Sequence, residues 1–318
     1  MLVEDRYGKE RVRLLRVTRH AGRHDLVELT VGIRFEGDFR AAHEDGDNRN
    51  VLPTDTMKNA VYALAHGAAP EPVEAFGLRL ARHFLDGNPQ VSRVRVELTE
   101  HPWARIEVGG KPHRHAFVRA GAELRTAEVT ATRSSVEVAS GLRSLLVLKT
   151  SGSAFAGFRK DRLTTLSETT DRVLTTSIDA CWTWSADPGP SWSEVRRTLL
   201  ETFAAHESRS VQHTLHAMGE AVLARFPGVA RIRLSLPNRH CLLVDLARFG
   251  LENRGEVFVP TDEPHGLIEA TLAREAPVRP RARATPGAPG GSARTSGSSA
   301  PRRSGRSGAP PPRRSRRS

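Results

Sequence analysis

The segment LDGNPQVSRVRVELTE, at residues 85–100, recurs later in the chain as LARFPGVARIRLSLPN, at residues 223–238. Six of the sixteen aligned positions are identical: Leu85/Leu223, Pro89/Pro227, Val91/Val229, Arg93/Arg231, Arg95/Arg233 and Leu98/Leu236. Each copy ends a helical pattern at a turn and then alternates apolar and polar residues, as a half-buried strand does. The same corner from helix to strand therefore occurs twice, which indicates a duplicated unit.

The elements expected around the two copies follow one order. Around the first copy, strands are predicted at 11–19, 27–35, 94–98 and near 115–119, and helices at 57–64 and 74–85. Around the second, strands are predicted at 127–138, 142–150, 172–184 and 232–236, and helices at 193–205 and 211–222. The apolar residues recur every second position, then about every 3.6 positions, and then every second position again. This pattern predicts an α+β fold of two tandem ββααββ units with antiparallel sheets.

We place the first unit at residues 1–123 and the second at 124–275. The two helices of each unit cover one face of its sheet, which puts the helices on the outside. Two sheets joined edge to edge still leave open edges, which proteins avoid exposing. Closure into an oligomeric β-barrel is the natural remedy, so we expect a symmetric oligomer whose functional pocket lies between subunits.

The chain has 318 residues, with 48 basic and 36 acidic side chains and a net charge of +12, which by itself suggests a nucleic-acid binder. Residues 276–318, however, contain 11 arginines and no acid, and 1–275 carry a net charge of only +1. This tail is rich in Arg, Pro, Ser and Gly, so we expect it to be disordered. It is either a solubilising extension or a site of weak, salt-sensitive contact with nucleic acid.

Several protein classes are excluded by composition and motifs. Two cysteines, Cys181 and Cys241, are too few for a disulfide-dense scaffold, and no apolar run is long enough to span a membrane. Neither a signal peptide nor a C-terminal peroxisomal signal is recognised, so a cytoplasmic protein is expected. Phosphate-loop, dinucleotide and zinc-protease motifs are absent. His113 and His115 share one strand face without a third ligand nearby, so no metal and no cofactor is expected.

Two polar clusters stand at the beginnings of elements. Tyr7-Gly8-Lys9 precedes the first strand, and VLPTDTMKN, at residues 51–59, opens the first helix. Thr54 and Asp55 are ordinary residue types for a helix start. The free N–H groups at the same place can also hold an anion, so both interpretations remain open.

Together with further motifs, these clusters resemble the urate oxidase (uricase) family. The further motifs are FAGF at 155–158, TTL at 164–166, Asp171-Arg172, PNRH at 237–240, and the segment 249–271. They occur in one order over roughly residues 7–272, so their combination is far more specific than any single motif.

The resemblance implies the T-fold (tunnelling fold), in which paired chains close a barrel and stack into a homotetramer. It also implies a cofactor-free oxidase that converts urate and O2 to 5-hydroxyisourate and H2O2. In that family the pocket lies between chains, and Lys9, Thr54 and Asp55 come from the neighbouring subunit.

The resemblance assigns substrate binding to Thr54 and Asp55 of the first unit and to five residues of the second. Arg172 matches the arginine that holds the flat urate anion, for which a planar guanidinium is a natural partner. Gln212 matches the amide that reads the opposite edge of the purine, Val211 contributes its backbone, and Phe155 matches the stacking aromatic. Asn238 would hold O2, or later a water, above the ring. An outward arginine, a solvent-facing glutamine and a core phenylalanine are the structural alternatives.

Lys9, Thr54 and His240 match the family's proton-handling group. Urate must lose a second proton before it can give an electron to O2, and a desolvated lysine can take that proton through the Thr54 hydroxyl. A solvated lysine is the alternative for Lys9. Two further functions remain open: a T-fold protein that binds a purine or pterin without oxidising it, and a nucleic-acid-binding role through the tail.

Overall fold

The computed structural model describes residues 1–67, 71–184 and 189–274. The tail at 276–318, for which disorder was predicted, lies outside these residues. No helix in the described part of the chain is long and apolar enough to cross a membrane.

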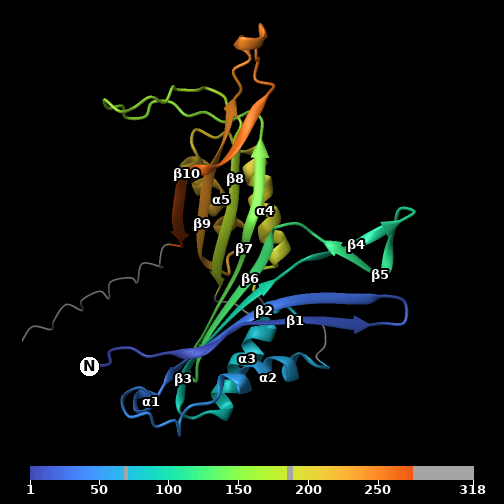
Figure 1. The fold of residues 1–318 in the computed structure, drawn as a ribbon, viewed down its shortest axis with the longest axis vertical. Coiled ribbons are helices and arrows are strands. Elements are labelled where there is room, and N and C mark those ends of the chain that lie inside the picture. The colour runs from blue at the N-terminus through green and yellow to red at the C-terminus, as the bar shows by residue number, and fades with distance from the viewer. Residues whose placement is uncertain (68–70, 185–188, 275–318) are drawn as a thin grey trace, which may run out of the picture. The chain divides into compact units, whose positions relative to one another are not determined.

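A single eight-stranded antiparallel sheet forms the centre of the fold (Figure 1). Its strands, in spatial order, are β1 (Tyr7–Arg19), β2 (His24–Gly37), β3 (Val91–Glu100), β6 (Leu124–Thr132), β7 (Val136–Lys149), β8 (Leu174–Trp184), β9 (Val229–Leu243) and β10 (Phe258–Ala273). A separate two-stranded sheet contains β4 (Trp103–Val108) and β5 (Lys111–Arg119). β1 and β10 therefore form the two open edges of the large sheet.

The helices are α1 (Arg40–Glu44), α2 (Thr54–Ala65), α3 (Val73–Gly87), α4 (Trp192–Ala205) and α5 (Val211–Arg225), and a 3₁₀ turn spans Ala247–Phe249. The strand register shows which face they cover. Leu98, Ala127, Ser140, Trp182 and Ile232 lie directly opposite one another across five successive strands. Because directly opposed residues share a face, both halves of the sheet bury the same face.

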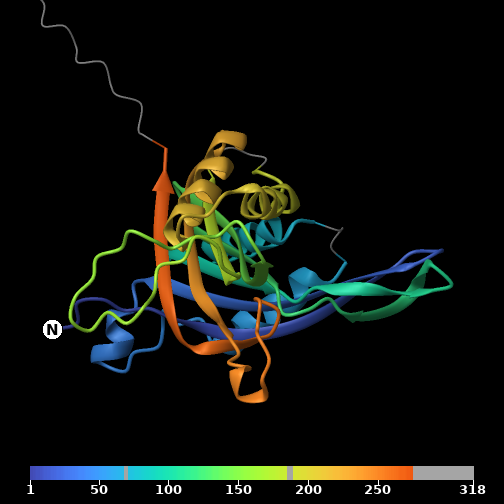
Figure 2. The ribbon, with the colours of Figure 1, turned by 90° about the horizontal axis from the view of Figure 1, so that it is seen from above.

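That face carries two apolar clusters. Phe84 of α3 lies in the first cluster, and Leu199 of α4 and Met218 of α5 lie in the second; all three are almost fully buried. Figure 2 shows α4 and α5 together on one side of the strands. The opposite face carries ion pairs, including Arg233 with Glu269 at 3.1 Å. The predicted α+β class, with an antiparallel sheet and helices on the outside, is confirmed.

The two copies of the repeated segment lie at equivalent corners, and each is held by one arginine. At each corner, an arginine from outside the repeated segment donates hydrogen bonds to three backbone carbonyls. Arg133 follows β6, and Arg274 follows β10. The carbonyls belong to Leu85, Asn88 and Val91 for Arg133, and to Leu223, Phe226 and Val229 for Arg274. These carbonyls occupy matching positions in the sequence alignment, which supports duplication of the unit. The boundary placed at 123/124 stays a prediction.

Two predicted strands differ from the structure. The strand expected at 127–138 is divided, because a turn at 133–135 separates β6 from β7. The Thr132 hydroxyl accepts from the backbone N–H groups of Ser134 and Ser135, and this local capping stabilises the turn. The strand expected near 115–119 belongs to β5, which pairs with β4 outside the large sheet.

A buried carboxylate joins the β4–β5 hairpin to the large sheet. Glu28 of β2 is 7% exposed and accepts hydrogen bonds from Arg13 Nε, Arg119 Nη2 and Trp103 Nε1, each at 2.7 Å. Burial alone would raise the pKa of Glu28, but these three donors lower it from 4.5 to about 2. The charged form of Glu28 is therefore part of the folded state.

Replacing Glu28 with glutamine should destabilise the protein by about 2 kcal/mol near neutral pH, because the charge-assisted bonds are lost while the site stays buried. Since the pKa is lowered on folding, the wild-type contribution is complete above about pH 4.5 and is lost as the pH falls towards 2. Urea unfolding at fixed protein concentration, repeated across this range, measures both effects. Glu4→Gln, at an exposed pair with Arg6, is the matched control. A Glu28→Gln stability that falls with pH as steeply as the wild type would contradict this expectation.

Candidate active site

The first group of predicted site residues lies where β1 begins and α2 begins. The Tyr7 hydroxyl accepts from the Leu52 N–H at 2.9 Å and donates to the Leu52 carbonyl at 3.2 Å. This pair of bonds ties β1 to the segment before α2. Asp55, in the first turn of α2, has its pKa lowered by its hydrogen bond from Lys58 and also by the nearby charge of Lys9. Lys9 is thus close to the start of α2, whose first residue is the half-buried Thr54.

The glycine before Lys9 is required by close packing of two backbones. A Cβ atom on Gly8 would lie 1.9 Å from the carbonyl oxygen of Ile33 on β2, so no larger residue fits. Beyond Lys9 the register of β1 against β2 shifts, and Arg11 adopts a φ of 57° within this bulge. Bulges re-aim neighbouring side chains, so the local backbone sets the direction of Lys9.

A second group lies at the far end of β8 and β9. Asn238 pairs in register with Thr176, whose hydroxyl donates to the Pro237 carbonyl at 2.9 Å. On the other side, the β9–β10 register shifts between Thr261 and Gly266, the partners of His240 and Asn238. Asn238 and His240 are both partly buried and lie beside this irregular stretch of β10. They also continue the alternation of the buried residues of β9 on the helix-covered face.

Arg172 and Phe155 lie next to each other in the same region. The Arg172 Cζ atom is 5.4 Å from the centroid of the Phe155 ring. Arg172 Nε is buried and has no hydrogen-bond partner among the described residues, and burial lowers the pKa of the guanidinium. Phe158 stacks on Phe155 at 4.9 Å with an interplanar angle of 14°, which covers one ring face. A half-buried planar cation whose Nε lacks a partner, beside an aromatic ring, is suited to a flat anionic ligand.

Asp171 is a supporting residue to which the sequence analysis gave no role. Its carboxylate accepts from the Ser151 hydroxyl at 2.6 Å and from the Ser153 N–H at 3.1 Å. The hydrogen bond from Ser151 is the main reason for its lowered pKa, and the Ser153 N–H adds to it. Asp171 therefore fastens the chain on both sides of the site, directly before Arg172. Its place in the Asp171-Arg172 motif was the available signal.

The start of α5 completes the second group. Val211 is the first residue of α5 and is 3% exposed, whereas the Gln212 side chain is exposed. Ser210 caps the helix, because its side-chain oxygen accepts from the His213 N–H at 3.1 Å. Val211 is thereby held in the core while Gln212 is presented at the helix start.

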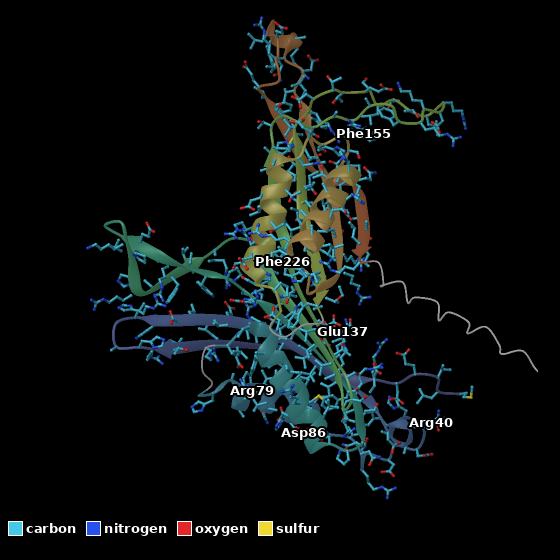
Figure 3. The ribbon with its side chains drawn as sticks, turned by 180° about the vertical axis from the view of Figure 1, so that it is seen from behind. Arg40, Arg79, Asp86, Glu137, Phe155 and Phe226 are labelled. Carbon is cyan, nitrogen blue, oxygen red and sulfur yellow. The ribbon has the colours of Figure 1, made fainter. Side chains whose placement is uncertain are left out.

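The structure brings together the predicted residues within each group, but it does not bring the two groups together in one chain. The first group is Lys9, Thr54 and Asp55; the second is Phe155, Arg172, Val211, Gln212, Asn238 and His240. Six strand spacings of about 4.8 Å, or about 29 Å along the sheet, separate β1 from β9. Figure 3 places Phe155 at one end of the long axis, opposite the end at which Figure 1 labels α2.

A metal centre was not expected from the sequence. Within the described ranges, no three or more His, Cys, Asp or Glu side chains are grouped so that they could hold a metal ion. On β5, the ring centroids of His113 and His115 are 4.6 Å apart.

Comparisons with known proteins agree along almost the whole described chain. The family model described as Uricase matches residues 5–130 and 138–269. The chain is 43% identical over 278 residues to a uricase of Arthrobacter globiformis, covering 86% of this chain and 90% of that protein. It is 36% identical to a uricase of Emericella nidulans, covering 86% and 97%.

Solved structures give the same result. The crystal structure of the Arthrobacter globiformis uricase superposes with a TM-score of 0.82 at 43% identity, covering 86% of this chain and 95% of that one. The structure of a uricase from Bacillus fastidious superposes with a TM-score of 0.74 at 25% identity, covering 85% and 93%. The T-fold expected from the sequence is thereby confirmed. Because the family model matches most of the chain and a relative is 43% identical over 86% of it, the chain belongs to the uricase family.

Proposed function

We propose that this chain is a urate oxidase, which converts urate, O2 and water to 5-hydroxyisourate and H2O2. The observation that carries the proposal is the half-buried Arg172, whose buried Nε lacks a partner, beside Phe155 in a chain that matches the uricase family over both units. The reaction needs a site for a flat anion and a route for protons, and the two groups of residues supply these separately.

The second group binds the substrate. Arg172 donates two parallel hydrogen bonds to one edge of the urate anion, which supplies the partner that its guanidinium lacks. The Gln212 amide and the Val211 backbone read the opposite edge. Phe155 stacks on the purine with the ring face that Phe158 leaves free. Because both ligand and cation are desolvated, the ionic contact is stronger than it would be in water.

Lys9, Thr54 and His240 handle protons. Lys9 takes the second proton of urate through the Thr54 hydroxyl, and the resulting dianion is electron-rich enough to reduce O2. Asn238 holds O2, and later the attacking water, above the purine ring. His240, two residues along β9, belongs to the same proton relay. The substrate is itself the reductant, so the scheme uses no cofactor.

The active site is shared between chains. Lys9, Thr54 and Asp55 are too far from Arg172 in one chain, so a neighbouring chain must supply them. The open edges of β1 and β10 offer the means, because pairing an edge with a second chain closes the sheet towards a barrel. The assembly that we propose is the homotetramer, with each site at a boundary between subunits.

Purified protein mixed with urate in air should remove the urate absorbance band without added metal or cofactor. The amount of H2O2 released should equal the amount of urate consumed. Oxygen uptake, peroxide and urate absorbance are followed together. A folded oligomer that leaves urate unchanged would contradict the proposal. Anaerobic urate binding by that same inactive oligomer would instead support the purine-binding alternative.

The basic tail provides a control for the third function considered. A chain that ends at residue 275 should keep its urate turnover and lose any retention on immobilised nucleic acid at low salt. Loss of turnover on removal of the tail would contradict the assignment of the active site to residues 1–275.

A further inference from the structure

Two histidines lie at the ends of the connection between α4 and α5. His206 follows the last residue of α4, and His213 is the third residue of α5. His206 Nε2 and His213 Nδ1 are 3.1 Å apart, and the ring centroids are 4.3 Å apart. We call these two side chains the imidazole pair. The pair closes the connection, residues 206–210, into a short loop.

The neighbours of His213 decide which nitrogen carries the proton. His213 Nδ1 also accepts from the backbone N–H of Arg209, at 3.4 Å, so it is the acceptor of the imidazole pair. His206 Nε2 is therefore the donor. A protonated His206 can still donate this bond, whereas a protonated His213 has no free lone pair on Nδ1. The pair thus requires a neutral His213.

The connection also holds the segment that carries the stacking ring. The Ser208 N–H donates to the Gly152 carbonyl at 2.9 Å, and the Ser208 carbonyl accepts from the Ala154 N–H at 2.7 Å. The next residue along that segment is Phe155. Ser208 is 3% exposed, and its hydroxyl accepts from the Thr214 hydroxyl of α5 at 2.7 Å. The connection is therefore bonded both to the Phe155 segment and to α5.

We propose that the imidazole pair is a positioning device for the substrate. By closing the connection, it holds Gln212, at the start of α5, at the separation from Phe155 that a flat purine requires. The inference rests on the proposed urate oxidase function. Neither histidine touches the substrate, so both are positioning residues, and their effect is on urate affinity.

Two charged groups lie beside the imidazole pair. The charged groups that face it are Lys149, whose ammonium donates to the His206 carbonyl at 2.6 Å, and Glu207. Burial, the neighbouring His213 and Lys149 lower the pKa of His206, and Glu207 opposes them in part.

The test compares urate dissociation constants, measured by calorimetry without O2 at about pH 8, where histidines are neutral. His213→Ala removes the acceptor, and His206→Ala removes the donor. His213→Asn places an amide oxygen near the position of Nδ1, so it restores an acceptor that cannot be protonated. His213 is exposed, His206 is half-buried and neither belongs to an apolar cluster, so these changes leave the core intact. His216→Ala, at an exposed histidine of the same helix, is the matched control.

At pH 8 we expect the two pair-breaking alanine variants to bind urate about threefold to tenfold more weakly, the range of one hydrogen bond. His213→Asn and His216→Ala should bind like the wild type there. The kcat at saturating urate should be unchanged in all variants. Wild-type affinity in His213→Ala, or equal weakening in His213→Asn and His213→Ala, would overturn the proposal. A wild type that binds no urate would instead overturn the proposed function itself, and the role of the pair with it.

Discussion

Replacing Arg172 with alanine should weaken urate binding by a hundredfold or more, because truncating one partner of a buried charge pair costs about 2–5 kcal/mol. The guanidinium has no competing carboxylate at its buried Nε, so its binding capacity is free for the ligand. Calorimetry with urate in the absence of O2 measures the loss directly. Arg172→Lys keeps the charge without the planar fork, and it should recover only part of the affinity.

The controls for Arg172 address folding. Its side chain packs against Phe155 rather than in either apolar cluster, so the alanine variant should keep its unfolding midpoint within a few degrees of the wild type. A folded Arg172→Ala protein with wild-type affinity would refute the assignment of Arg172 as the anchor. A change in kcat with affinity retained would move Arg172 from binding to chemistry.

Replacing Lys9 with methionine should lower kcat by about 10² to 10⁴, the range of a lost general base, while urate affinity is largely kept. Methionine has a similar length but cannot accept a proton. Stopped-flow kinetics at saturating urate separates this effect from binding. Lys58→Met, at the neighbouring lysine that pairs with Asp55, is the control and should cost much less. Equal losses at Lys9 and Lys58 would contradict a specific role for Lys9.

The same two variants test whether the site is shared. Chains with Arg172→Ala and chains with Lys9→Met are each expected to be inactive alone. In a mixed oligomer, a site between an intact Lys9 and an intact Arg172 of different chains is complete, and in a random mixture this is about a quarter of the sites. Co-refolding should therefore restore activity to roughly that fraction. If both groups acted within one chain, mixing would restore nothing.

The elements with strong periodicity were predictable from the sequence. The apolar residues Val94, Val96 and Leu98 alternate as the β3 pattern requires, and all three are buried. The division of the predicted strand 127–138 left a signal that the prediction did not use: Ala127, Val129 and Ala131 fall on one phase, whereas Val136 and Val138 fall on the other. The deciding contacts are side-chain hydrogen bonds of Thr132, which period-based analysis does not consider.

The candidate site was also only partly predictable from the sequence. Its residue types were recognisable from the motifs. Leu174, Ile178 and Trp182 lie an even number of residues after Arg172, and all three are buried. Their grouping depends on bonds between residues far apart in the chain, such as the bonds of the Tyr7 hydroxyl to Leu52, and no local pattern encodes those. The distance between the two groups follows from strand order, which likewise cannot be read from any one segment.

Arg133 and Arg274 make equivalent hydrogen bonds at the two corners, but the two residues are not equally protected from changes made to the chain. Arg133 lies between β6 and β7, two inner strands of the sheet, whereas Arg274 follows β10, an edge strand. Its three bonds to the α5–β9 corner depend on the chain reaching that far. A purification tag, a fusion partner or a surface linkage therefore has to be attached beyond Arg274, and not at the end of β10.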